Sequence, residues 1–199
     1  MNTKPMVAIG FAAAIALAGS ASAQVSKPNG VNPANKATTG QATSNAQKLS
    51  KADQSFMKEA IQGDLAEVKM GQLAQQKGQS EDVKQFGQTL QQDHSQNLQQ
   101  AQQLAQQNGM TPPTEPSAEA KKMYDKLSKM SGAQFDKAFA KDMVSDHKKD
   151  IAKFQKESKS QGPTGQFAQQ TLPVLQKHLQ MAQSIESKGA SVGSKAGAK

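Results

Sequence analysis

The sequence has 199 residues and contains no cysteine, no tryptophan, no arginine and only one tyrosine. Without cysteine the chain has no disulfide bond, thiolate metal ligand or cysteine nucleophile, and we expect no acyl anchor on an N-terminal cysteine. All 24 basic residues are lysine. Arginine, whose side chain binds phosphate and guanine with paired hydrogen bonds, is therefore missing. Few aromatic rings are available to stack on bases. We therefore predict no nucleic-acid partner, although the formal net charge is +8.

The positive charge is concentrated at the two ends of the chain. Between Asp53 and Glu186 the sequence has 16 lysines and all 16 of its acidic residues, so this stretch is formally neutral. The other eight lysines lie before and after it, without acidic neighbours. We interpret these lysines as parts of solvated ends; the alternative is weak attachment of the N-terminal end to an anionic surface.

The first 23 residues are typical of a secretory signal peptide. Lys4 supplies a positive charge, Met6–Ala18 forms an apolar run, and Ala21-Ser22-Ala23 is a cleavage site of small residues. The run is too short to span a bilayer, and no second such run follows. We predict export from a bacterial cytoplasm to the periplasm or beyond, with no membrane span after cleavage. The alternative is a short uncleaved anchor.

The rest of the chain divides into three segments. Residues 24–51 are rich in small and polar residues and have few large apolar ones, which predicts a disordered tether. Residues 52–186 show the apolar periodicity of helices. Residues 187–199 contain three glycines and are expected to be a flexible tail.

Residues 52–186 predict four long helices and one short helix, with serine caps at the starts and glycines at the ends. The expected helices run from Ser50 or Asp53 to Gly78, from Ser80 to Asn108, from Ser117 to Ser131, from Phe135 to near Gly162, and from Phe167 to Ile185 with a kink at Pro173. Short connections join the first pair and the last pair of long helices, and a long connection carries the short helix. This pattern predicts an all-α, ferritin-like antiparallel four-helix bundle.

The three histidines of the chain, His94, His147 and His178, each fall on the apolar seam of an expected helix. Each also lies near the middle of its helix, so antiparallel packing places them in one transverse layer. Glu67 lies near the middle of the first helix, between two glycines that allow close approach of a neighbour. Three imidazoles and a carboxylate in one layer suit Zn²⁺, Cu²⁺ or Fe²⁺.

These residues also have plain structural interpretations. A histidine on an apolar seam is often hydrogen-bonded within a core. Asp64 and Glu67 together can be exposed helix charges, and Asp93 and Asp146 can cap or pair with surface lysines. The methionines are expected to fill gaps in the core. Imidazole rings more than about 8 Å apart would exclude shared ligation of one ion.

No recognisable enzyme motif is present. The residues three positions before the histidines are Gln91, Val144 and Leu175, so the Glu-x-x-His motif of di-iron ferritins is missing and ferroxidase chemistry is not expected. The sequence also lacks a phosphate-binding loop, an HExxH motif, a GxSxG motif and a glycine-rich dinucleotide turn. We predict no catalytic residues, and no cofactor other than a possible metal ion.

Several motifs in this stretch resemble those of a known exported bacterial family. They are Asp53-Gln-Ser-Phe-Met-Lys-Glu-Ala, Asp93-His94, Met143-Val-Ser-Asp-His147 and Leu172-Pro-Val-Leu-Gln-Lys-His178-Leu. With them the chain resembles the domain of unknown function 4142 family, which is placed among ferritin-like helical bundles. The resemblance covers roughly residues 51–186. It implies a periplasmic or secreted ferritin-like domain, and it supplies no established catalytic residues.

Two functions follow as hypotheses. The first is a non-enzymatic envelope or stress-related interaction domain with an unidentified protein or envelope partner, in which the histidines are structural. The second is a metal-binding bundle that holds Zn²⁺, Cu²⁺ or Fe²⁺ with His94, His147, His178 and Glu67.

Overall fold

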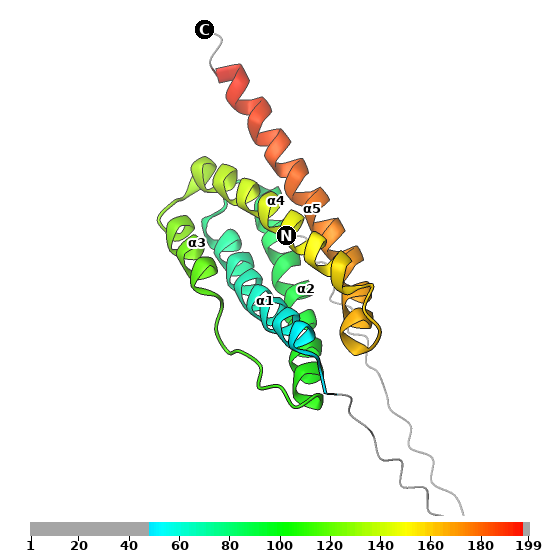
Figure 1. Cartoon of the computed structure of the whole chain (residues 1–199). Coiled ribbons are helices and arrows are strands. Elements are labelled where there is room, and N and C mark those ends of the chain that lie inside the picture. The colour runs from blue at the N-terminus through cyan, green and yellow to red at the C-terminus, as the bar shows by residue number, and fades with distance from the viewer. Residues whose placement is uncertain (1–47, 197–199) are drawn as a thin grey trace, which may run out of the picture. The chain divides into compact units, whose positions relative to one another are not determined.

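The computed structural model describes residues 48–196, and this part of the chain is all-α, without strands. Its five helices are α1 (Lys51–Lys77), α2 (Glu81–Gln107), α3 (Ala118–Ser128), α4 (Gly132–Glu157) and α5 (Pro163–Ala196) (Figure 1). The expected signal peptide and all but the last few residues of the expected tether lie outside the described residues. Within them, no helix combines the length and the apolar character needed to cross a membrane.

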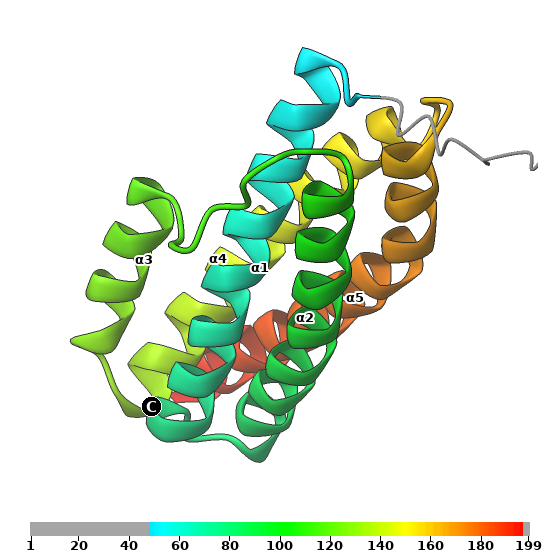
Figure 2. The same ribbon diagram turned by 90° about the horizontal axis from the view of Figure 1, so that it is seen from below.

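The helices form two hairpins. α1 packs along α2, and α4 packs along α5, while fewer contacts join α2 to α5 and α1 to α4 (Figures 1 and 2). The short helix α3 lies in the long connection between the hairpins and packs against α1 and α4. The predicted order of short, long and short connections is therefore present in the helical bundle.

Serine side chains cap three of the helices, as predicted. Ser50 forms a reciprocal capping box with Asp53, in which each side chain accepts the other residue's backbone N–H, at 3.1 and 3.0 Å. Ser80 and Ser117 each accept the backbone N–H three residues further on. Asp136 of α4 accepts two backbone N–H groups of the turn between α1 and α2, at 2.9 and 2.8 Å. This carboxylate connects the two hairpins.

The helix bounds differ from the predicted ones at several ends: α3 ends at Ser128 and not at Ser131, and α4 ends at Glu157 and not near Gly162. Leu49 is buried, so the folded part begins inside the segment expected to be a tether. α4 starts at Gly132, and α5 starts at Pro163, where a proline is accepted because the first helical N–H has no partner. α5 also continues to Ala196, through most of the expected tail. An isolated glycine costs a helix only about 1 kcal/mol, so glycines alone do not end an established helix.

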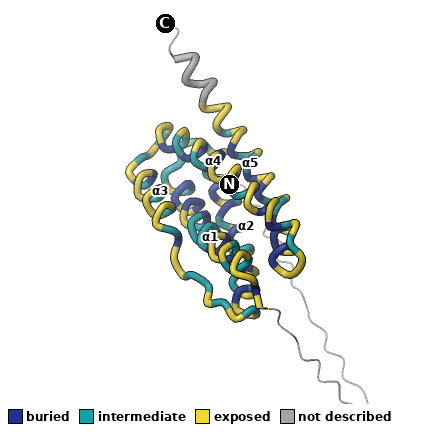
Figure 3. Tube along the Cα trace, viewed as in Figure 1, coloured by how far each residue is buried: buried dark blue, intermediate teal, exposed yellow. Residues whose placement is uncertain are grey.

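The core consists of two apolar clusters with a polar layer between them (Figure 3 shows the buried inward faces). One cluster contains Phe86, Phe135 and Phe139, and the other contains Phe154 and Phe167. Each histidine lies between residues of the two clusters along its own helix. The buried polar residues Asp64, Glu67, His94, His147 and His178 form this layer.

α1 and α2 approach each other closely at a pair of glycines. A Cβ atom placed on Gly71 would lie 2.5 Å from the carbonyl oxygen of Gly87 and 2.8 Å from the backbone nitrogen of Gln91. A Cβ atom on Gly63, on the same helix, would meet nothing within 4 Å. The predicted close approach beside Glu67 is therefore confirmed at Gly71 but not at Gly63.

This difference predicts opposite effects of one substitution at two positions of α1. Gly71→Ala forces the two backbones apart, and we expect it to lower the free energy of unfolding by about 2 kcal/mol. Gly63→Ala meets no atoms, and we expect no loss or a gain of up to about 1 kcal/mol because alanine favours the helix. Urea unfolding followed by circular dichroism measures both. Equal losses in the two variants would contradict the glycine contact.

Candidate metal centre

The three histidines converge at the centre of the polar layer, from α2, α4 and α5. Their ring centroids lie 6.0 Å apart for His94 and His147, 5.2 Å for His94 and His178, and 5.4 Å for His147 and His178. One ring nitrogen of each lies within 4.8 Å of those of the other two. All three side chains are buried. The predicted layer of three imidazoles is present, and its rings are well inside the limit of about 8 Å for shared ligation.

One nitrogen of each ring faces a hydrogen-bond acceptor. His94 Nδ1 lies 2.8 Å from Asp64 Oδ1, and His147 Nδ1 lies 3.0 Å from its own helix at the carbonyl oxygen of Met143. His178 Nε2 lies 2.9 Å from Asp93 Oδ2. A carbonyl or carboxylate oxygen accepts only, so each of these nitrogens carries the proton and donates. The second nitrogen of each neutral ring then has a free lone pair.

Those second nitrogens are buried and have no hydrogen-bond partner in the part of the chain that the structure describes. They are His94 Nε2, His147 Nε2 and His178 Nδ1. A buried acceptor without a partner costs about 1–3 kcal/mol, and most buried polar atoms in proteins are paired. Three such atoms on three helices of one polar layer are therefore an arrangement that needs an explanation. A hydrogen-bonded core histidine accounts for one nitrogen of each ring and leaves the other unexplained.

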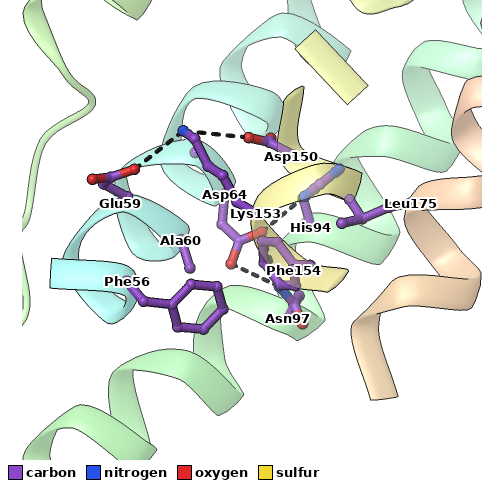
Figure 4. A pocket seen from close by; sticks show the side chains of 11 residues that line it. Phe56, Glu59, Ala60, Asp64, His94, Asn97, Asp150, Lys153, Phe154 and Leu175 are labelled. Carbon is purple, nitrogen blue, oxygen red and sulfur yellow. Dashed lines mark hydrogen bonds and ion pairs between the residues drawn. The ribbon is translucent and has the colours of Figure 1, made fainter. Parts of the chain in front are cut away.

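A chain of hydrogen bonds holds His94 in place through its ring nitrogen Nδ1. Asn97 donates to both carboxylate oxygens of Asp64, at 3.1 and 2.9 Å, and Thr171 donates to the Asn97 side-chain oxygen at 2.9 Å. Figure 4 shows Asp64 between His94 and Asn97. This chain links α1, α2 and α5. It fixes the position of the ring, as outer partners commonly do for metal-binding histidines.

The interpretation of Asp64 and Glu67 as exposed helix charges is wrong. Asp64 is 4% exposed and Glu67 is 3% exposed, because both face the polar layer. The expected lysine partner of Asp93 is present, since Lys177 Nζ lies 3.7 Å from its carboxylate. The same carboxylate holds His178, a contact that the sequence analysis missed. Asp64 is far in sequence from His94, and Asp93 is far in sequence from His178, so no local sequence pattern predicts these two contacts.

Burial keeps two of the rings neutral. It lowers the pKa of His147 to about 3, and it lowers the pKa of His178 to about 4, with help from the neighbouring His94. Burial also acts to lower the pKa of His94, but the hydrogen bond and charge of Asp64 outweigh it and raise that pKa. Burial raises the pKa of Asp64, opposed by His94. At neutral pH, His147 and His178 therefore carry the lone pairs that a metal ion needs.

Glu67 lies beside the three histidines but is not part of the group of converging nitrogens. Its Oε2 atom is buried and has no hydrogen-bond partner among the described residues. Burial raises the pKa of Glu67 to about 8, and the carboxylates of Asp146 and Asp150 raise it further, against the lowering effect of His94. The side chain is therefore mainly protonated at neutral pH in the metal-free protein.

This pKa predicts a pH-dependent effect of Glu67→Gln. Protonated Glu67 contributes stability that is fully present below its ordinary pKa of 4.5 and is lost as the pH rises through about 8. Glutamine resembles the protonated acid and does not ionise. We expect the stability of the variant relative to wild type to grow by about 1 kcal/mol per pH unit between pH 5 and 8, in chelator-treated protein.

Urea unfolding at several pH values measures this difference. Glu81→Gln, on the exposed face of α2, is the matched control and is expected to give a flat profile. A flat profile for Glu67→Gln as well would show that Glu67 is ionised in the folded protein at neutral pH.

The fold and this centre define a class: a helical bundle with three buried, oriented histidines in a polar layer between two apolar clusters. The chain belongs to the family described as domain of unknown function (DUF4142), whose profile matches residues 38–185. The predicted family is thus confirmed. No curated protein and no solved structure matches the chain.

Proposed function

We propose that this protein binds a transition-metal ion with His94, His147 and His178. The observation that carries the proposal is the set of three buried ring nitrogens, one on each histidine, that have no hydrogen-bond partner among residues 48–196. A cation bound by their lone pairs satisfies all three at once, once His94, whose pKa Asp64 raises, has released the proton from its second nitrogen. Asp64, the Met143 carbonyl and Asp93 act as the outer partners that orient the rings.

The spacing of the nitrogens requires only a small adjustment. Metal–nitrogen bonds of about 2.0–2.1 Å in a tetrahedral site place ligand nitrogens about 3.3 Å apart. The converging nitrogens here lie within 4.8 Å of one another, so ring movements of about 1 Å bring them together. Neutral imidazoles suit Zn²⁺, Cu²⁺ and Fe²⁺. Glu67 as a fourth ligand is a further part of the proposal, since a nearby cation favours loss of its proton.

The finer description of the fold and the location in the cell are also proposals. Two hairpins joined by a long connection support a ferritin-like arrangement, and the missing Glu-x-x-His motif argues against di-iron chemistry in it. Export to the periplasm or beyond rests on the features of the first 23 residues. A non-enzymatic envelope or stress-related role stays a prediction from the sequence.

Zinc titration of the untagged protein tests metal binding. After treatment with a chelator, we expect one Zn²⁺ per chain by calorimetry, and at least a 100-fold loss of affinity, or about 3 kcal/mol, in His147→Ala. The chain has no other histidines, so the triple His94, His147 and His178 to alanine variant gives the background. Asp125→Asn, on the exposed face of α3, is the control. Wild-type binding no tighter than that of the triple variant would refute the proposal.

Substitution of the outer carboxylates gives a graded effect. Asp64→Asn and Asp93→Asn each keep an oxygen that accepts the histidine N–H but lose the negative charge. We expect each to weaken Zn²⁺ binding by about 10- to 100-fold. Circular dichroism checks that both variants fold. If both variants bind Zn²⁺ with the wild-type affinity, these carboxylates do not position the histidines for metal binding.

A further inference from the structure

A cavity of about 320 Å³ lies between α1, α3 and α4, on the α1 and α4 side of the histidine layer. Acidic side chains dominate its charge, with six carboxyl groups and two ammonium groups in its wall. The carboxyl groups are those of Glu59, Glu67, Glu119, Asp142, Asp146 and Asp150, and the ammonium groups are those of Lys149 and Lys153. We call this space the acidic cavity.

The carboxyl groups form a series from solvent towards the histidines. Asp146 is exposed and Asp150 is half-buried, while Glu67, which also lines the cavity, is buried and has an Oε2 atom without a hydrogen-bond partner among the described residues. Asp142, Asp146 and Asp150 are spaced by four residues along α4 and therefore share one face of that helix. Lys153 neutralises part of this charge, since its Nζ lies 3.1 Å from Glu59 and 3.8 Å from Asp150.

A second, much smaller cavity shares wall residues with the acidic cavity and reaches His94. It holds about 20 Å³, which is room for one water molecule, and Asp64 and His94 line it (Figure 4). Four residues line both cavities: Glu59, Gly63, Asp150 and Lys153. The side chain missing at Gly63 leaves open space at this junction.

We propose that the acidic cavity is a binding site for hydrated divalent cations on their way to the three histidines. The inference rests on the proposed metal binding and adds where the ion is captured. Asp146 and Asp150 attract the hydrated ion, because carboxylate oxygens bind such ions through their water shells. Glu67 is the innermost carboxyl group in the wall of the cavity. Of the three histidines only His94 lines the smaller cavity, so the ion would meet this ring first.

An opening on the opposite side fits a cation less well. It holds about 230 Å³ between α2 and α5 and also reaches His94. Its wall consists largely of glutamine and asparagine amides, and its one carboxylate, Asp93, is engaged with His178 and Lys177. The acidic cavity is therefore the favoured route for a positive ion.

Stopped-flow mixing of the untagged, metal-free protein with Co²⁺ tests this route, with the visible absorption of the bound ion as the signal. The double variant Asp146→Asn/Asp150→Asn is expected to take up Co²⁺ about tenfold more slowly than wild type while still binding one ion per chain. Its rate should also depend less on ionic strength. The control Glu81→Gln/Asp125→Asn removes two exposed charges outside the cavity wall and is expected to keep the wild-type rate.

A steric variant tests the same route without a change of charge. Gly63→Leu fills the junction between the two cavities, and we expect it to slow Co²⁺ uptake about tenfold. Gly63→Ala, which meets no atoms, is its control. Gln96→Trp narrows the opposite opening and is expected to leave the rate unchanged.

The outcomes separate this inference from the proposed function. Co²⁺ bound at wild-type rates by both the double variant and Gly63→Leu would refute the route and leave the histidine centre in place. Slow uptake in Gln96→Trp would place the route between α2 and α5 instead. A loss of equilibrium affinity in the double variant without slower uptake would make Asp146 and Asp150 part of the final site. Failure of the wild-type protein to bind either Co²⁺ or Zn²⁺ would refute both proposals.

Discussion

The hydrogen bond between the buried His94 and Asp64 is the interaction on which the rest of the polar layer depends. It joins α1 to α2 at the level where two apolar clusters meet, and removing either partner leaves a buried polar group unpaired. Asn97 and Thr171 extend the bond to α5. A polar layer of this kind also fixes the register of the helices, since a shift by one turn would place charged groups in an apolar cluster.

The polar layer depends on the close packing of α1 against α2 in the first hairpin. Gly71 and Gly87 bring the backbones of α1 and α2 together about two turns from Asp64. Close approach of the backbones allows a short carboxylate on one helix to reach a ring on the other. The glycine pair and the buried pair therefore support each other, and the second hairpin supplies the two remaining rings.

Local rules predicted most of the fold from the sequence. Serine caps at Ser50, Ser80 and Ser117 and the apolar periodicity marked the helices, because these signals act within one or two turns. The extent of α5 was missed, since no local stop is strong enough in that tail. The layer of His94 and its two partner rings was predicted from their seam positions and from their places near the middle of each helix. The contacts of Asp64 with His94 and of Asp93 with His178 were not, because they join residues 30 and 85 positions apart.

The three rings come from both hairpins, and His94 and His147 are separated by the whole segment that contains α3. An ion shared by these rings closes a loop across that segment. Such an ion would bind the folded chain and not the unfolded one, so it would stabilise the fold by an amount that grows with the concentration of free ion. In a sequence without cysteine, a reversible link of this kind would join the two hairpins where no disulfide bond can.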